Sequence, residues 1–238
     1  MNIFSLQLHT LKNCIDCDNF FDTLLKLKEY GYSFVEICEN YGLLAEEIRE
    51  YAEKADIDIC GYHINMLSDF HSQLDFAVEL GCEFVVYPNA KVETVDDAVK
   101  LGCALRELSE KAIMRGLRFC YHNHDSEFKK TDDGLYLFDI IAENAGDICE
   151  FEFDIGWIKF AGADPYEFMR SYAGRTPLLH LRQIKDGVFC ALAHGDIDLK
   201  SIISLGDRFG VEHYIVEFPS SVDALEDAEN SAKFIKEL

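Results

Sequence analysis

The chain has 238 residues, of which 49% are hydrophobic and 28% charged, so it can bury a sizeable core and is not expected to be disordered. Its formal net charge of −22 lacks the positive surface that nucleic acids and anionic membranes attract, and we expect neither as a partner. No apolar run reaches the roughly 18 residues that a membrane-spanning helix needs.

The first residues, MNIFSLQLH, contain neither a basic segment nor a long apolar core, so we expect no signal peptide and a cytoplasmic protein. The nine cysteines are scattered and lie mostly within apolar runs, where a thiol behaves as a small buried hydrophobic group. Reduced thiols are therefore expected. The single CxxC pair, Cys14 and Cys17, is weak evidence for a zinc or redox site.

Short β-rich segments alternate with helical patterns along the whole chain. Apolar residues between the strands recur at helical spacing, and capping boxes are expected at Thr94 with Asp97 and at Ser220 with Asp223. Glycines that suit helix ends stand before later strands, at Gly31, Gly81, Gly116 and Gly210. Strands are predicted at residues 2–9, 33–38, 56–64, 83–88, 117–122, 149–156, 177–185 and 212–218.

Eight strand–helix alternations in a chain of this length are typical of an α/β fold, the (β/α)8 TIM barrel. An open, doubly wound sheet is the rival, but neither of its usual nucleotide-binding motifs, GxGxxG or GxxxxGK[ST], follows a strand. Because no linker-like segment divides the sequence, a single barrel domain is predicted for residues 1–238.

The reactive groups of a TIM barrel gather at the carboxyl ends of its strands. In this sequence a polar side chain stands at each predicted strand end, about once per strand–helix unit. This regular recurrence favours a functional site at that end of the barrel. The residues are His9, Glu36, His63, Tyr87, His122 with His124, Asp154, Gln183 with Lys185, and Glu217.

The segment YHNHDSEF places His122 and His124 two residues apart, so a strand would turn both imidazoles to the same face. Neutral imidazole is a good ligand for Mn²⁺, Zn²⁺ or Fe²⁺. Packing alone would place one ring against its neighbours and the other in solvent. Two rings on one face, with carboxylates on neighbouring strands, favour a functional role.

The acidic strand ends have structural alternatives. Asp154 could cap the following helix or bind a metal, and Glu217, which follows three apolar residues, needs a cationic partner such as Lys185 or a metal ion. In LLHLRQIKD, a period of two puts Gln183 and Lys185 on one face. If that face points inward, His180 becomes a core or helix-facing histidine.

Further strand-end residues are expected to contact a substrate. His63 in GYHINM and Trp157, which follows the sixth strand, could line the pocket or could equally pack in the core. Aromatic side chains are common walls for sugar rings. His124, just after the fifth strand, and His9 and Glu36, which end the first two strands, are expected to face the same pocket.

Taken in order, these motifs resemble the xylose isomerase-like TIM-barrel superfamily, and most closely its sugar phosphate isomerase/epimerase branch. The resemblance covers nearly the whole chain, from residue 5 to about residue 220. The patterns YHNHxxEF and FDxGWxxxAGxDP together are fairly specific for this branch, though not for one substrate. The matching segments are LQLHTLKN, GYSFVEICENYG, YHNHDSEF, FEFDIGWIKFAGADP, QIKDG, HGDID and YIVEF.

The resemblance implies a divalent metal at the barrel mouth, Mn²⁺ before Mg²⁺ or Zn²⁺, with His122, Asp154, Gln183 and Glu217 as ligands by position. Two of these depart from the common pattern, since Gln183 replaces the histidine of HxKD and His122 replaces a glutamate. The hydroxypyruvate isomerase-like members resemble this chain in having the glutamine. Its harder oxygen donor suits Mn²⁺ or Mg²⁺ better than Zn²⁺.

The resemblance also implies the reaction, which is isomerisation or epimerisation of a small keto sugar or polyol-derived ketone. A proton would move at the carbon next to the carbonyl group, while the metal polarises the oxygens. Carried over by position, Glu217 is expected as the base, His122 as the second acid or base, and Lys185 as the stabiliser of oxyanion charge.

Two alternatives use the same residues. One is a dehydratase or lyase that acts on an inosose or a 3-keto sugar, and the other is a non-catalytic barrel that binds a sugar or a protein and whose metal site has decayed. A DNA-repair endonuclease is disfavoured by the net charge of −22. Barrels of this branch are often dimers or tetramers, so a homodimer or homotetramer is expected.

Overall fold

Eight parallel strands close into a barrel in the computed structural model, which describes residues 4–64, 67–88 and 90–238. The strands follow one another round the barrel in chain order, and the last one pairs with the first. The predicted TIM barrel is therefore confirmed, although residues 2 and 3 of the first predicted strand lie outside the described residues. The strands are β1 (Phe4–Gln7), β2 (Phe34–Ile37), β3 (Asp58–His63), β4 (Phe84–Tyr87), β5 (Arg118–His122), β6 (Glu150–Asp154), β7 (Leu178–Leu181) and β10 (His213–Val216).

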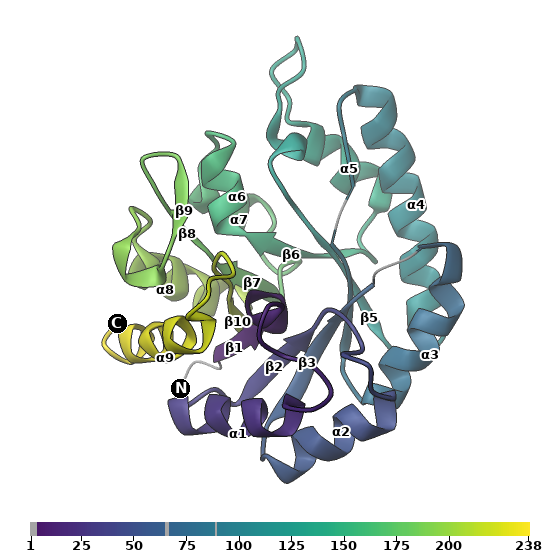
Figure 1. Cartoon of the computed structure of the whole chain (residues 1–238). Helices are drawn as coiled ribbons and strands as arrows, with labels where there is room; N and C mark the ends of the chain where they lie inside the picture. The colour runs from purple at the N-terminus through teal and green to yellow at the C-terminus, as the bar shows by residue number, and fades with distance from the viewer. Residues whose placement is uncertain (1–3, 65–66, 89) are drawn as a thin grey trace.

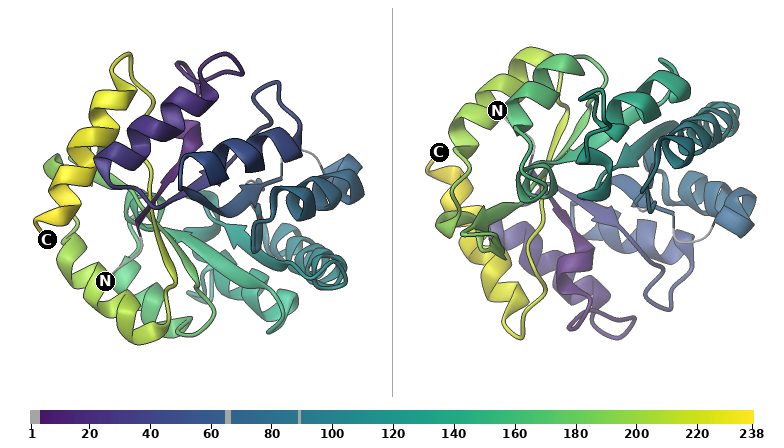
Figure 2. Two further views of the ribbon diagram at one scale, coloured as in Figure 1. Left: turned by 90° about the horizontal axis from the view of Figure 1, so that it is seen from below. Right: turned by 90° about the horizontal axis from the view of Figure 1, so that it is seen from above.

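Helices surround these strands on the outside of the barrel (Figures 1 and 2). Each of the longer helices buries an apolar stripe against the strands, as the 3.6-residue period predicts. In the described part of the chain no helix is long and apolar enough to cross a membrane. The α-helices are α1 (Phe20–Tyr30), α2 (Ala45–Lys54), α3 (Phe70–Leu80), α4 (Val95–Ile113), α5 (Leu137–Ala145), α6 (Ile155–Phe160), α7 (Pro165–Ser171), α8 (Leu199–Phe209) and α9 (Ala224–Lys236), and the short 3-10 turns are η1 (Leu8–Leu11), η2 (Leu67–Asp69), η3 (Ser126–Phe128) and η4 (Leu192–His194).

The helix ends agree with the sequence signals except at Ser220 and at Gly116, which lies two residues beyond Met114, the C-cap of α4. The capping box at Thr94 and Asp97 is confirmed, and the Thr94 side chain accepts a hydrogen bond from the Asp97 N–H at 3.1 Å. Ser220 does not begin α9. Instead Ser221 accepts from the Asp223 N–H at 3.2 Å, in a turn that precedes the helix. The helix-ending glycines Gly31, Gly81 and Gly210 adopt left-handed conformations.

Inside the barrel an apolar layer lies beneath a polar one. The apolar layer is built from Cys60, Phe84, Val86, Cys120, Leu178 and Ile215. Since side chains two residues apart share a face, the next inward position along three of these strands is His122, His180 or Glu217. The alternation of side chains along the strands therefore places a set of ionisable groups at the mouth of the barrel.

The seventh predicted strand, residues 177–185, is two strands in the structure. β7 ends at Leu181, and β8 (Gln183–Lys185) pairs antiparallel with β9 (Val188–Cys190) outside the barrel. A two-residue Asp186–Gly187 turn with positive φ angles joins them. Our inward assignment of Gln183 and Lys185 was therefore wrong, because the barrel parity runs through Leu178 and His180.

The last helix lies beside the first where the barrel closes. Figure 1 shows α9 beside α1. The Tyr32 hydroxyl donates to the Ala228 carbonyl at 3.0 Å, and the Lys236 ammonium donates to the Tyr30 carbonyl at 2.7 Å. These bonds fix α9 against the C-terminal end of α1.

Candidate active site

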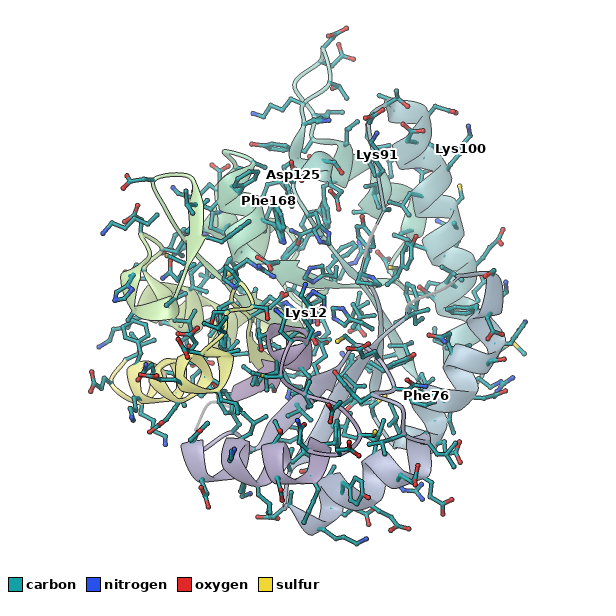
Figure 3. All side chains as sticks on the ribbon, viewed as in Figure 1. Lys12, Phe76, Lys91, Lys100, Asp125 and Phe168 are labelled. Carbon is teal, nitrogen blue, oxygen red and sulfur yellow. The ribbon has the colours of Figure 1, made fainter. Side chains whose placement is uncertain are left out.

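A cavity of about 410 Å³ opens at the carboxyl ends of the barrel strands. Its position is the one that TIM-barrel enzymes use for catalysis. In Figure 3, Lys12 of its rim lies near the middle of the molecule, whereas Lys91 and Lys100 lie at the periphery. Six of the sequence-predicted residues line the cavity, namely His9, His63, His122, His124, Trp157 and Glu217.

Glu36 lies beneath the cavity, where it is fully buried. Its Oε2 accepts hydrogen bonds from the Gln7 amide at 2.6 Å and from His180 Nε2 at 2.8 Å. Gly61 makes room for it, since a Cβ atom there would lie 3.1 Å from Glu36 Oε1. Glu36 therefore supports the histidines from below and does not line the cavity.

His180 is the centre of the buried polar network. Its Nδ1 is 2.8 Å from Glu217 Oε2 and its Nε2 is 2.8 Å from Glu36 Oε2. Both ring nitrogens therefore face carboxylates, which makes both of them donors and the ring an imidazolium. Burial alone would lower the pKa of His180, but the carboxylates of Glu152 and Glu36 outweigh it and raise that pKa well above its ordinary value.

Glu152 joins two further histidines to this network. Its Oε2 accepts from His63 Nε2 and from His122 Nδ1, each at 2.9 Å. Burial would lower the pKa of His63, but Glu36 and Glu152 raise it to about 10. For Glu152 itself burial would raise the pKa, yet His180 and His63 hold it well below the usual range. Glu152 is therefore an ionised carboxylate among positively charged rings.

His122 has the opposite electrostatic character. Burial, together with the nearby charge of His180, lowers its pKa to about 3, so the ring is neutral. Because its Nδ1–H donates to Glu152, the lone pair is on Nε2. His122 lines the cavity and presents this unprotonated nitrogen there.

Arg182 connects the two carboxylates at the far side of the network. Its Nε donates to Asp154 Oδ2 at 2.8 Å, and its Nη2 pairs with Glu217 Oε1. Asp154 also caps α6, because its Oδ1 accepts from the Trp157 N–H at 2.9 Å. Burial would raise the pKa of Glu217, but Arg182 and His180 hold it well below its usual range.

One wall of the cavity is aromatic. The rings of His124 and Trp157 lie 5.0 Å apart, and Trp157 packs edge-on against Phe189 at 4.5 Å. Burial lowers the pKa of His124, so this ring too is neutral. An apolar surface of this kind suits the C–H face of a sugar ring.

Gln183 and Lys185 lie away from this cluster. The Gln183 amide donates to the Ile197 carbonyl at 2.7 Å and accepts from the Ile197 N–H at 3.0 Å, so both of its polar atoms hold a loop. Lys185 is exposed on the β8–β9 hairpin. The expected positions of both side chains are thus corrected, since their strand leaves the barrel at Arg182.

Three residues of the network were not predicted from the sequence. His180 was expected in the core if Gln183 faced inward, and neither Arg182 nor Glu152 was expected at the site. The signal that would have found the first two is IKDGVF, because an Asp-Gly pair between short β-rich segments is typical of a hairpin. A hairpin there ends the barrel strand before Gln183.

Among the residues that the structure describes, two groups of side chains could hold a metal ion. In each group one ligand atom from every residue lies within 4.8 Å of the others. The first group is His63, His122, Glu152 and His180, and the second is His122, Asp154, His180 and Glu217. His122 and His180 belong to both groups.

Comparison with known proteins gives a match to one family model. The model described as "Xylose isomerase-like TIM barrel" matches residues 24–238. Among curated relatives, an inosose dehydratase of Clostridium perfringens is 24% identical over 190 residues, which are 70% of this chain and 63% of that protein. The chain thus spans less than two thirds of the length of this relative.

Two solved structures illustrate the shared fold. A sugar phosphate isomerase/epimerase from Parabacteroides distasonis superposes with a TM-score of 0.85 at 23% identity, over 98% of this chain and 93% of that one. A 3-keto-D-glucoside 4-epimerase from E. coli superposes with a TM-score of 0.78 at 14% identity, over 100% of each chain. Identities this low establish the fold alone.

Proposed function

This chain belongs to the xylose isomerase-like TIM-barrel family, and from that premise we propose that it is an isomerase or epimerase of a small keto sugar or polyol-derived ketone. The observation that carries the proposal is the pairing of a neutral imidazole, His122, with an ionised carboxylate, Glu217, at one cavity. The ligand atoms of the two residues lie within 4.8 Å of each other. That separation suits groups that act on adjacent atoms of one substrate.

His122 is the base of this proposal. Its Nε2 lone pair takes the proton from the carbon next to the carbonyl group. The electrons of that C–H bond form a C=C double bond, and the π electrons of the carbonyl group move to its oxygen. The Glu152 carboxylate orients the ring and stabilises the imidazolium that forms, as a carboxylate–histidine pair does in other enzymes. We prefer His122 to Glu217 because both oxygens of Glu217 already accept from charged donors.

The remaining steps use residues of the same cavity. The oxyanion that develops on the substrate is stabilised by the Arg182 guanidinium, which takes the role expected of Lys185. Glu217 accepts a hydrogen bond from a neighbouring hydroxyl group of the substrate. Since His122 and Glu217 both start without the exchangeable proton, the proton that His122 removes is the one it returns, to the former carbonyl carbon. The hydroxyl proton of the first carbon passes to the oxyanion, so that the carbonyl group moves to that carbon, and this favours isomerisation over a two-base epimerisation.

A dehydratase is the second candidate, and the similarity to inosose dehydratase favours it. The first step is the same. His122 would then pass the proton to a departing β-hydroxyl group, so that water leaves and a double bond forms. Only the fate of the oxyanion intermediate separates the two reactions.

A metal ion does not fit the second group as the side chains stand. Asp154 accepts from Trp157 and Arg182 on its two oxygens, and Glu217 accepts from Arg182 and His180 on its two. Both nitrogens of His180 donate, whereas a metal ligand must offer a lone pair. Since Gln183 is also absent from the cluster, we route no step through the expected Mn²⁺.

The proposal is tested by incubating the protein in heavy water with L-ribulose, D-fructose, an inosose and a 3-keto-D-glucoside, and by following the products by NMR. An isomer of one of these sugars supports the isomerase, and an enone with loss of water supports the dehydratase.

His122→Asn should lower the rate by about 10²–10⁴, the usual contribution of a general base. His194→Asn, on an exposed histidine, is the control and should leave the rate unchanged. A normal rate in His122→Asn would contradict the assigned base.

A further inference from the structure

Arg182 occupies the space between the two carboxylates of the second group. Its Nε and Nη2 contact Asp154 and Glu217 respectively. The side chain is only 10% exposed, yet it lines the cavity. A guanidinium keeps its positive charge at any pH at which a protein is folded. A fixed cation is therefore already present where a metal would sit.

The surroundings of Arg182 are shaped to hold it. Gly156 has no side chain, and a Cβ atom there would lie 2.8 Å from both Cβ and Cγ of Arg182. The guanidinium carbon lies 5.7 Å from the Trp157 ring centre and 5.1 Å from that of Phe189. These contacts enclose both the aliphatic part and the guanidinium group of the side chain. If Arg182 moved out of the cavity, it would lose this packing, the cation–π contacts and two ion pairs.

The chemistry of arginine also explains why this residue can bridge the pair. Its planar group presents several N–H donors in a fixed fork, which can contact two carboxylates at once. A lysine, with a single nitrogen at the end of a flexible stem, cannot reproduce that bridge. Removing the arginine would leave two buried carboxylates with one cationic partner fewer, an arrangement that attracts another cation.

We infer that Arg182 is the permanent cation of this site and takes the place of a divalent metal ion between Asp154 and Glu217. While the guanidinium is in place, every oxygen of the two carboxylates already accepts a hydrogen bond, so Mn²⁺ would have to displace the arginine to bind between them. The N–H groups that the two carboxylates leave unused are available to an oxyanion in the cavity. The inference concerns the resting protein, and it holds for an isomerase, a dehydratase or a binding protein alike.

Mn²⁺ binding, read from the loss of the electron paramagnetic resonance signal of the free ion, tests the inference without any substrate. The proteins compared are the wild type, Asp154→Asn, Arg182→Ala and the double variant Arg182→Ala/Asp154→Asn. The wild type should bind Mn²⁺ only as weakly as Asp154→Asn does, through scattered surface carboxylates. Arg182→Ala should gain about one equivalent, bound at least about tenfold more tightly, which is about 1.4 kcal/mol. The double variant should lose that gain.

Two results would overturn the inference. One is a wild-type protein that binds about one equivalent of Mn²⁺ which Asp154→Asn abolishes. The other is an Arg182→Ala protein that folds but binds Mn²⁺ no more tightly than the wild type. If circular dichroism shows that Arg182→Ala is unfolded, the neutral variant Arg182→Gln replaces it, and an affinity equal to that of the wild type then counts against the inference. None of these measurements depends on turnover. The inference about Arg182 can therefore be overturned while the proposed function holds, and the proposed function can be overturned while the inference holds.

Discussion

At the scale of single residues, the site is organised by rings and carboxylates whose charges are set by their neighbours. His180 and His122 lie with their ring centres 4.7 Å apart, yet His180 is charged and His122 neutral. The difference arises because two glutamates face the nitrogens of His180, whereas His122 meets one glutamate and the charge of His180. Identical side chains thus serve as a fixed cation and as a proton acceptor.

Gln183 gives a residue-scale prediction. Gln183→Ala would leave the buried N–H and C=O groups of Ile197 without their partner, and each such loss costs about 1–3 kcal/mol. We therefore expect a clear fall in the free energy of unfolding, measured by urea denaturation, and Mn²⁺ binding unchanged from the wild type. Lys185→Ala, on the exposed face of the same hairpin, is the matched control and should stay within about 0.5 kcal/mol of the wild type. Equal stability of the two variants would contradict the structural role of Gln183.

At the scale of elements, helix α6, which follows β6, and the β8–β9 hairpin, which follows β7, determine where Arg182 lies. Helix α6 starts at Ile155, so Gly156 lies in its first turn, directly against the arginine stem. The β8–β9 hairpin brings Phe189 over the guanidinium, 5.1 Å from its carbon atom. Neither element belongs to the barrel sheet, and both are short. They hold the arginine from two sides.

Gly156→Ala tests this packing. Alanine is the better helix former by about 1 kcal/mol, so an open position would gain stability. Here the new methyl group meets Arg182 Cβ and Cγ at 2.8 Å, and overpacking of this kind costs about 1–3 kcal/mol. We expect a net loss of stability in thermal unfolding and slower turnover, because Arg182 must shift. Lys159→Ala, on the exposed side of the same helix, should change neither, and a Gly156→Ala protein more stable than the wild type would refute the close contact.

At the scale of the whole molecule, the chain is a closed barrel with a large excess of negative charge. It has 44 acidic and 22 basic residues, which gives the net charge of −22. Ion pairs offset this only locally, as at the other end of the barrel, where Arg118 contacts Glu83, Glu150 and Glu212. Single exposed ion pairs elsewhere, such as Lys54 with Glu50 and Lys100 with Asp96, contribute little to stability because solvent screens them. Long-range repulsion therefore dominates the electrostatics of the folded state.

This balance predicts that salt stabilises the protein. Raising NaCl from about 0.01 M to about 0.1 M shortens the screening length from about 30 Å to about 10 Å, which weakens repulsion across the molecule. We expect the midpoint of thermal unfolding at neutral pH to rise with NaCl, as measured by calorimetry. Repeating the series with KCl separates screening from binding of a particular cation. A midpoint that falls with both salts would mean that ion pairs, and not repulsion, control the stability.

The sequence by itself determined the fold and much of the mouth of the barrel. Local patterns with periods of two and 3.6 residues predicted the eight strand–helix units and the strand-end positions of His63, His122 and Glu217. Such patterns, like the capping box at Thr94, do not depend on contacts between distant parts of the sequence. The same local rule failed at residues 177–185. The alternating pattern of a strand continues there past the point at which the backbone leaves the barrel sheet. The period of two residues does not show with which other strand each segment pairs.

Only the tertiary structure decided the electrostatic character of the site. The charge on His180, the neutrality of His122 and the bridge of Arg182 depend on carboxylates from β2, β6 and the end of β10, which are far apart in the sequence. Burial raises the energy of every unpaired charge, so each group takes the protonation state and the partner that its neighbours allow. Those neighbours become adjacent only when the barrel closes.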